Sequence, residues 1–294
     1  MLNIRKILLP VVFTDPFTDT SRHPVQQAAW LARRFQAEII LLHVVSPLSY
    51  PYGVLESGHN ITARDLHAEA VRRAQEDLDQ TSPPEFDGIT VTSVLLRGDP
   101  AGEIVETARN RNVDLIVMAT HGHGALYRLL LGSVTAKVLH ETQCLVWTSA
   151  HSEETTGPFS IRRVLCSVDL TLHNRHTLTR AAEMAAAVNA DLTLVHITSS
   201  VESFGPGGSH VNAEWKKTIV GIAEKEMVEL QQAVGTTAQV VIDSGNVPQL
   251  LNRAAEQTKA DVLVIGHKPG RSHLGDNGEG YGIIRQARIP VLSV

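Results

Sequence analysis

The sequence predicts two tandem α/β domains, each built on a five-stranded parallel sheet that is doubly wound, so that helices cover both of its faces. Three stretches of the first half recur in the same order in the second half, which indicates a duplicated domain. Short aliphatic runs alternate with longer amphipathic stretches, as in successive βαβ units. The short runs are apolar along nearly their whole length, which is typical of strands buried on both faces.

Three matching pairs of segments define the repeat. The pairs are 6–15 with 163–172, 37–45 with 190–198, and 113–122 with 260–270. His43 and His196 occupy the same place in the second pair, at the ends of apolar runs, where a packing or hydrogen-bonding role is expected.

A polar segment separates the two halves. Residues 151–160, HSEETTGPFS, lack apolar periodicity and contain Gly157 and Pro158, so they are predicted to be a linker. The predicted domains are therefore 1–150 and 161–294.

Five strands and four helices are expected in the first half. Residues 6–12, KILLPVV, form the first strand rather than a signal peptide, because Pro10 interrupts the run, no cleavage site follows and Asp15 is acidic. The later strands are β-branched or aliphatic runs, and the helices have apolar residues at helical spacing. These strands are expected at 39–45, 89–96, 114–119 and 144–148, and the helices at 22–36, 62–80, 100–111 and 133–141.

The second half repeats the pattern. Residues 215–232, like residues 61–80, are amphipathic and are expected to be crossover helices that face the core, with a helix on a membrane surface as the alternative. The strands are expected at 163–168, 191–197, 238–243, 261–266 and 291–294.

Composition excludes several classes of protein. The 294 residues carry a net charge of −5, which argues against general binding to nucleic acid. No run of about 18 uncharged apolar residues occurs, so no membrane span is expected. Cys144 and Cys166 lie in apolar runs and are expected to be reduced, buried thiols, which suits the cytoplasm. His121 and His123 form an HxH pair, but no cysteine or carboxylate recurs at zinc-like spacing, so no metal site is predicted.

The segment after the fourth expected strand has the strongest signal for a ligand. Ligands of open α/β sheets bind beyond the carboxyl ends of the strands. Here Gly122 and Gly132 bracket nine residues, and Ser133 then opens a helix as its predicted N-cap. Backbone amides and the helix dipole at such a place form an anion site. The alternative is a capped helix after a glycine-rich turn.

This segment resembles the nucleotide-binding pattern of the universal stress protein family, G-xx-G, nine residues, then G-S/T. The resemblance covers both halves and implies a fold like that of the adenine nucleotide α-hydrolases, with strand order 3-2-1-4-5 and domains that pair through their fifth strands. It implies an ATP, ADP or AMP site in the first domain, with Mg²⁺. The phosphates would lie at Gly122, Gly132, Ser133 and Val134, near Ala119, Thr120 and His121, and the adenosine against Pro10, Val11, Val12 and Val44.

Two residues of the first half depart from the family pattern. Ala119 replaces its first glycine, which is a mild change unless that residue needs a positive φ. Val12 stands where the family has an aspartate that accepts hydrogen bonds from the nucleoside. Loss of one charged hydrogen bond costs about 1.5–3 kcal/mol, or one to two decades of affinity. Asp15 could compensate from the following loop, or it could be an ordinary turn residue.

The second half keeps the aspartate at the end of its first strand, as Asp169, but departs from the glycine pattern after its fourth strand. Tyr281 replaces the serine or threonine of the pattern, and Asp276 and Glu279 place negative charge where phosphates would lie. Lys268 and Arg271 could offset this charge, but no nucleotide is expected in this half. The alternatives are a pocket for another ligand and a purely structural partner domain. The candidate pocket residues are Asp169, His196, Gly266, His267, Gly270 and Gly280.

The resemblance therefore implies a cytoplasmic stress-response protein that binds an adenine nucleotide as a regulatory ligand and reports it to protein partners. Two chains are expected to be able to associate further. Two other functions stay open: a scaffold that binds no nucleotide, and a slow ATP hydrolase with His121 as its base. No catalytic residue is assigned, because the sequence has no P-loop, dinucleotide fingerprint or nucleophile elbow.

Overall fold

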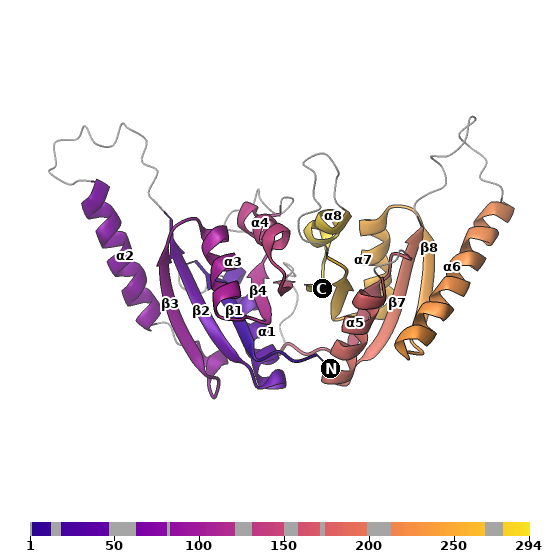
Figure 1. The fold of residues 1–294 in the computed structure, drawn as a ribbon, viewed down its shortest axis with the longest axis horizontal. Coiled ribbons are helices and arrows are strands. Elements are labelled where there is room, and N and C mark those ends of the chain that lie inside the picture. The colour runs from indigo at the N-terminus through magenta and orange to yellow at the C-terminus, as the bar shows by residue number, and fades with distance from the viewer. Residues whose placement is uncertain are drawn as a thin grey trace.

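The computed structural model describes residues 2–12, 19–46, 63–80, 83–120, 131–149, 158–170, 174–198, 213–267 and 279–294. Within these residues the backbone forms one continuous ten-stranded sheet with the strand order β3-β2-β1-β4-β5-β10-β9-β6-β7-β8 (Figure 1). Each half therefore has the predicted order 3-2-1-4-5. The predicted fold class, two tandem doubly wound domains, is confirmed.

The strands lie within two residues of their predicted limits. The strands of the first half are β1 (Lys6–Val11), β2 (Glu38–Val45), β3 (Val91–Arg97), β4 (Leu115–Ala119) and β5 (Leu145–Ser149). The strands of the second half are β6 (Arg163–Ser167), β7 (Asp191–Thr198), β8 (Gln239–Ser244), β9 (Val262–Ile265) and β10 (Val291–Ser293).

The helices follow the duplicated pattern. Matched caps mark one pair: the Asp99 side chain accepts from the Gly102 amide at the start of α3, and Asn246 accepts from Gln249 at the start of α7. A short 3-10 helix, η2 (Pro84–Phe86), was not expected. The helices are α1 (Asp19–Phe35), α2 (Ala63–Gln80), α3 (Pro100–Asn110), α4 (Ser133–Glu141), α5 (Asn174–Val188), α6 (Ala213–Val234), α7 (Val247–Thr258) and α8 (Glu279–Gln286).

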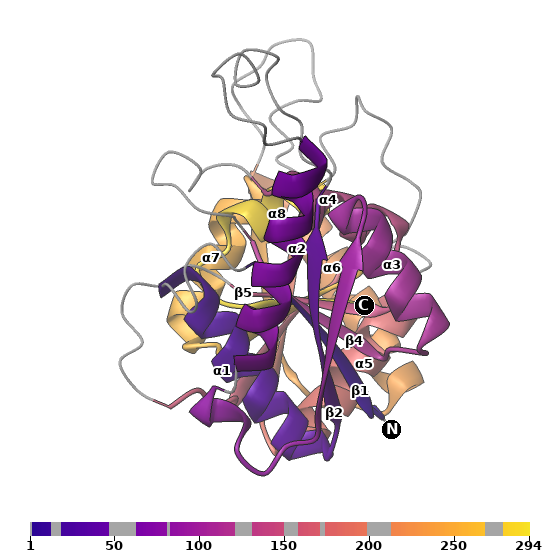
Figure 2. The ribbon, with the colours of Figure 1, turned by 90° about the vertical axis from the view of Figure 1, so that its left-hand side faces the viewer.

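Helices cover both faces of the sheet, and Figure 2 shows α1 and α3 on opposite sides of the first half. Buried residues of α1, α2, α5 and α6 join one large core that spans both halves. The other face has two cores, one under α3 and α4 and one under α7 and α8. None of the helices in the described ranges is long and apolar enough to cross a membrane.

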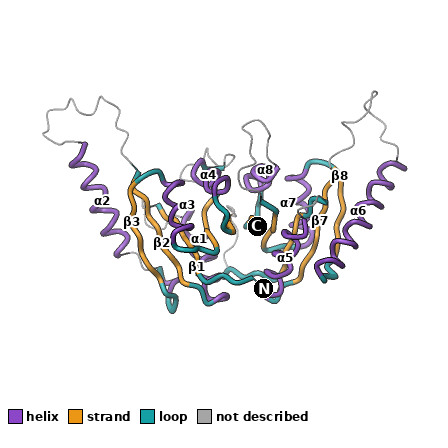
Figure 3. The backbone as a smooth tube through the Cα atoms, in the orientation of Figure 1, coloured by secondary structure: helices purple, strands orange, loops and turns teal. Residues whose placement is uncertain are grey.

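The two halves join through their fifth strands, as predicted. β5 and β10 are antiparallel, with Val291 opposite Thr148, Leu292 opposite Trp147 and Ser293 opposite Val146. Figure 3 shows the strands of the two halves meeting at the centre of the molecule. Because antiparallel edge strands exchange backbone hydrogen bonds, neither half leaves this edge of its sheet unpaired.

Trp147 lies at the seam, which is the junction of β5 with β10 where the two halves meet. Its side chain is fully buried, and its Nε1 donates to Gln27 Oε1 at 2.7 Å, an oxygen that also accepts from Ser149 Oγ at 2.6 Å. Phe159, from the described end of the predicted linker, meets the Trp147 ring edge to face at 6.0 Å and the Trp30 ring at 5.5 Å. Only residues 158–160 of the predicted linker are described.

Both cysteines are free, and only one is fully buried as expected. Burial raises the pKa of Cys166 to about 12, so this thiol stays protonated at neutral pH. Cys144 is half-buried, and its Sγ donates to the Val113 carbonyl at 3.2 Å.

Candidate functional site

The candidate site of the first half lies at the carboxyl edge of its sheet, where β1 pairs with β2 on one side and β4 on the other. The strand order reverses between β1 and β4, and ligands of open α/β sheets bind at this switch point. Val12 follows β1 and is 58% exposed. Pro10, Val11 and Val44 are half-buried on the neighbouring strand ends.

The start of α4 is tied to the end of β4. The Gly132 amide donates to the Thr120 carbonyl at 2.9 Å, and Thr135 Oγ1 donates to the Ala119 carbonyl at 3.0 Å. Thr120 is itself buried, with its hydroxyl donating to the Ser149 carbonyl at 3.1 Å. These bonds hold the first turn of α4 against the strand end that precedes it.

The predicted N-cap of α4 is wrong by one residue. Gly132 is the N-cap, with φ −57° and ψ 140°, and Ser133 is the first helical residue and is exposed. Glycine has no side chain, so the N-cap residue itself offers no side-chain acceptor to the amides of the first turn. The N-cap thus leaves room for a different acceptor at this helix start. Val134 follows, half-buried, whereas His121 and Gly122 lie outside the described residues.

A matched histidine supports the end of the first strand in each half. His43 Nδ1 lies 2.8 Å from the Val11 carbonyl, and His196 Nδ1 lies 2.7 Å from the Val168 carbonyl. A carbonyl oxygen can only accept, so Nδ1 carries the proton in both rings. The expected hydrogen-bonding role of both residues is confirmed. The bonds also place Val12 and Asp169 as equivalent residues, each one position after the supported carbonyl.

The candidate residues of the second half lie in different surroundings. Asp169 is exposed beside the carbonyl that His196 supports. A Cβ on Gly266 would lie 2.7 Å from Thr177 Oγ1 of α5, so any larger residue here would force the Thr177 side chain to shift. Gly280 lies inside α8, unlike Gly132, which precedes α4. Gly270 lies outside the described residues.

Comparison with known proteins decides the family. The sequence model of the universal stress protein family matches residues 3–149 and 160–294. The chain belongs to the universal stress protein family. A universal stress protein of Methanocaldococcus jannaschii is 31% identical over 142 residues, which are 48% of this chain and 79% of that protein.

Two relatives extend over most of this tandem universal stress protein. One from Mycobacterium bovis is 24% identical over 268 residues, 86% of each chain. The crystal structure of a universal stress protein from Archaeoglobus fulgidus superimposes with a TM-score of 0.66 at 20% identity, over 100% of this chain and 97% of that one. The latter likeness supports the fold.

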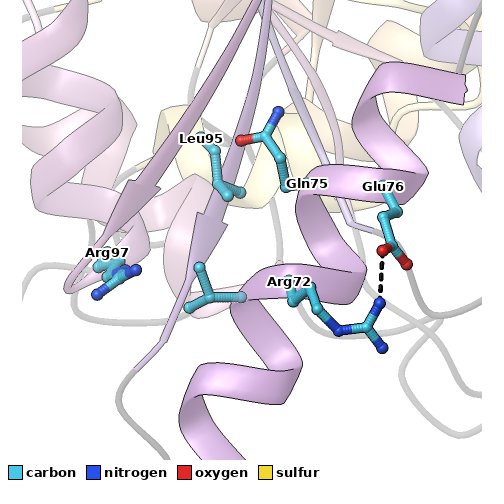
Figure 4. Close-up of a pocket in the computed structure, with 6 residues that line it drawn as sticks. Arg72, Gln75, Glu76, Leu95 and Arg97 are labelled. Carbon is cyan, nitrogen blue, oxygen red and sulfur yellow. Dashed lines mark hydrogen bonds and ion pairs between the residues drawn. The ribbon is translucent and has the colours of Figure 1, made fainter.

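Two hollows with described linings lie away from the candidate site. One, of about 510 Å³, opens between α2 and β3, where Arg72 is ion-paired with Glu76 and Arg97 lies at the strand end (Figure 4). The other, of about 680 Å³, lies at the amino-terminal edge of the sheet around Lys6 and Arg33. Neither hollow contains a predicted site residue of this universal stress protein.

His267 faces the other half of the molecule. Its ring approaches the backbone carbonyl of Leu139 in α4, while its Nε2 is buried without a hydrogen-bond partner. Burial lowers the pKa of His267, the neighbouring His140 lowers it further, and the Leu139 carbonyl partly opposes both.

This lowered pKa predicts a loss of stability in acid. Because the folded protein binds the His267 proton more weakly than the unfolded chain, the free energy of unfolding falls as the pH falls through the ordinary range of histidine, about 6.5, towards the lowered folded pKa. We expect His267→Asn to lose less stability than the wild type between pH 8 and pH 5, measured by urea unfolding. The matched control is His176→Asn, at an exposed site on α5. An equal loss in His267→Asn and the wild type would contradict this assignment.

Proposed function

We propose that this universal stress protein binds an adenine nucleotide, ATP, ADP or AMP, at the carboxyl edge of its first half as a regulatory ligand. The observation that carries the proposal is the start of α4. Its N-cap is a glycine without a side-chain acceptor, and the helix is tied by Thr135 to the end of the strand beside β1. First-turn amides and the helix dipole are suited to a phosphate group.

The surrounding residues fit the rest of a nucleotide. Gly132 offers no Cβ to obstruct a phosphate, and the exposed Ser133 can add its hydroxyl. Val12, with Val11 and Val44, offers apolar surface for the base. Mg²⁺ would accompany the nucleotide and bind its phosphate oxygens.

We infer that the second half binds no nucleotide. Gly280 is the second residue of α8, whereas Gly132 is the N-cap that precedes α4. Tyr281 follows Gly280 in the sequence as Ser133 follows Gly132, but it is the third residue of α8 and contributes a large ring in place of a small hydroxyl group. One nucleotide for each chain is therefore expected.

Titration calorimetry with Mg-ATP tests the proposal, together with the mass spectrometry of small molecules released from the purified protein. We expect one site for each chain and a rise in melting temperature with ATP. Ser133→Ala should weaken binding about 2- to 10-fold, because it removes one hydrogen bond. Ser93→Ala, at an exposed serine on β3, is the matched control. Absence of heat up to millimolar ATP would overturn nucleotide binding, and two sites would overturn the assignment of the second half.

A further inference from the structure

Residues of the second half form part of the packing around α4. Leu131, just before the N-cap, and Leu139, in the last turn, pack against a core that otherwise consists mainly of second-half residues, including Ile283 and Val291. Val134 and Val138, by contrast, pack against the core of the first half. Since α4 contacts both cores, its orientation depends on both halves.

Polar contacts also cross the seam to α4. Tyr281 of α8 donates its hydroxyl to the Ala136 carbonyl at 3.2 Å. The His267 ring approaches the Leu139 carbonyl one turn further along the same helix. Both second-half groups reach backbone oxygens of α4 on the side that faces the seam. Figure 1 shows α4 and α8 side by side at the centre of the molecule.

The place of Tyr281 in the chain is informative. In the sequence it follows Gly280 as Ser133 follows Gly132, but in the structure it is the third residue of α8, whereas Ser133 is the first residue of α4. From this place in the first turn of α8 the Tyr281 side chain reaches across the seam. Its hydroxyl contacts α4 three residues after Ser133.

We propose that Tyr281 is a positioning residue for the ligand site of the first half. Its hydroxyl fixes the direction of α4 and hence the first-turn amides. A short helix moves nearly as a rigid body, so a restraint on the Ala136 carbonyl restrains the amides one turn away. The inference rests on the proposed nucleotide site. It assigns the second half the role of ordering that site in advance, which lowers the cost of binding.

Tyr281→Phe tests this role, because it removes the hydroxyl and keeps the ring that packs at the seam. We expect ATP binding to weaken about 2- to 10-fold and amide hydrogen exchange in residues 135–141 of the ligand-free protein to become faster. The matched control is Thr258→Val, which removes a hydroxyl that donates to the Ala254 carbonyl at 2.7 Å inside α7. It should alter neither quantity.

If α8 orders the nucleotide site through α4, a bound nucleotide must in turn order α8. ATP should slow exchange in residues 281–286 of α8 in the wild type, and less so in Tyr281→Phe. Wild-type ATP affinity in Tyr281→Phe would overturn the positioning role, whatever its exchange rates. If the wild type binds no ATP, the proposed function fails, and exchange in ligand-free α4 still decides whether Tyr281 orders this helix: wild-type rates in the variant would overturn the inference.

Discussion

Trp147→Ala is expected to lower the free energy of unfolding by about 3–5 kcal/mol, the usual cost of deleting a large buried aromatic side chain. The ring is fully buried at the seam, directly opposite Leu292, and it packs against Phe159. Removal also leaves the Gln27 side chain without its indole donor. Urea unfolding followed by circular dichroism measures this loss.

Trp147→Phe separates packing from hydrogen bonding at the same site. It keeps a smaller aromatic ring and removes the indole N–H together with part of the buried ring surface, while Ser149 Oγ still donates to Gln27. We therefore expect a smaller loss, about 1–3 kcal/mol. A loss below about 1 kcal/mol in Trp147→Ala would show that the seam does not depend on this side chain.

Val12→Asp is expected to tighten ATP binding about 10- to 100-fold. The change restores the acceptor that the family pattern has at this position and that Asp169 keeps in the second half. A charged hydrogen bond contributes about 1.5–3 kcal/mol. Val12 is 58% exposed, so the carboxylate can stay hydrated and adds little cost of burial. Titration calorimetry with Mg-ATP measures the change in affinity.

Two controls identify the cause of such a gain. Val12→Asn offers a neutral acceptor of similar shape and should tighten binding less than the aspartate. Val91→Asp makes the same charge change at an exposed valine of β3, at the outer edge of the sheet, and should leave affinity unchanged. Weaker binding in Val12→Asp would mean that the carboxylate repels the phosphates, and would contradict the placement of the nucleoside beside residue 12.

Much of the fold could be predicted from the sequence, because its signals are local or repeated. Aliphatic runs marked the strands to within two residues, and the duplicated segments implied that both halves share one strand order. The equivalence of Val12 and Asp169 was visible in the aligned halves and is confirmed by the matched bonds of His43 and His196. The pairing of the fifth strands came from the family resemblance.

The sequence predicted the N-cap of α4 less well, because backbone geometry decides which of two adjacent residues takes that position. Ser133 is a good N-cap residue by type, yet Gly132 is the N-cap and Ser133 is the first helical residue. The Gly132 amide bonds to Thr120 and Thr135 bonds to Ala119, so the anchor to β4 sets where the helix starts. η2 was also missed, since its Phe86 is buried by packing beside α1 rather than by a periodic pattern.

The sequence by itself determined the fold class, the duplication, the glycine-rich approach to α4 and the unequal retention of family residues in the two halves. Only the tertiary structure decided what holds α4 in place. Tyr281 and Ala136 are 145 residues apart, and the contact of their atoms depends on the antiparallel pairing of β5 with β10. Local propensity and spacing carry no information on such a contact, because it forms only when two separately patterned sheets meet edge to edge.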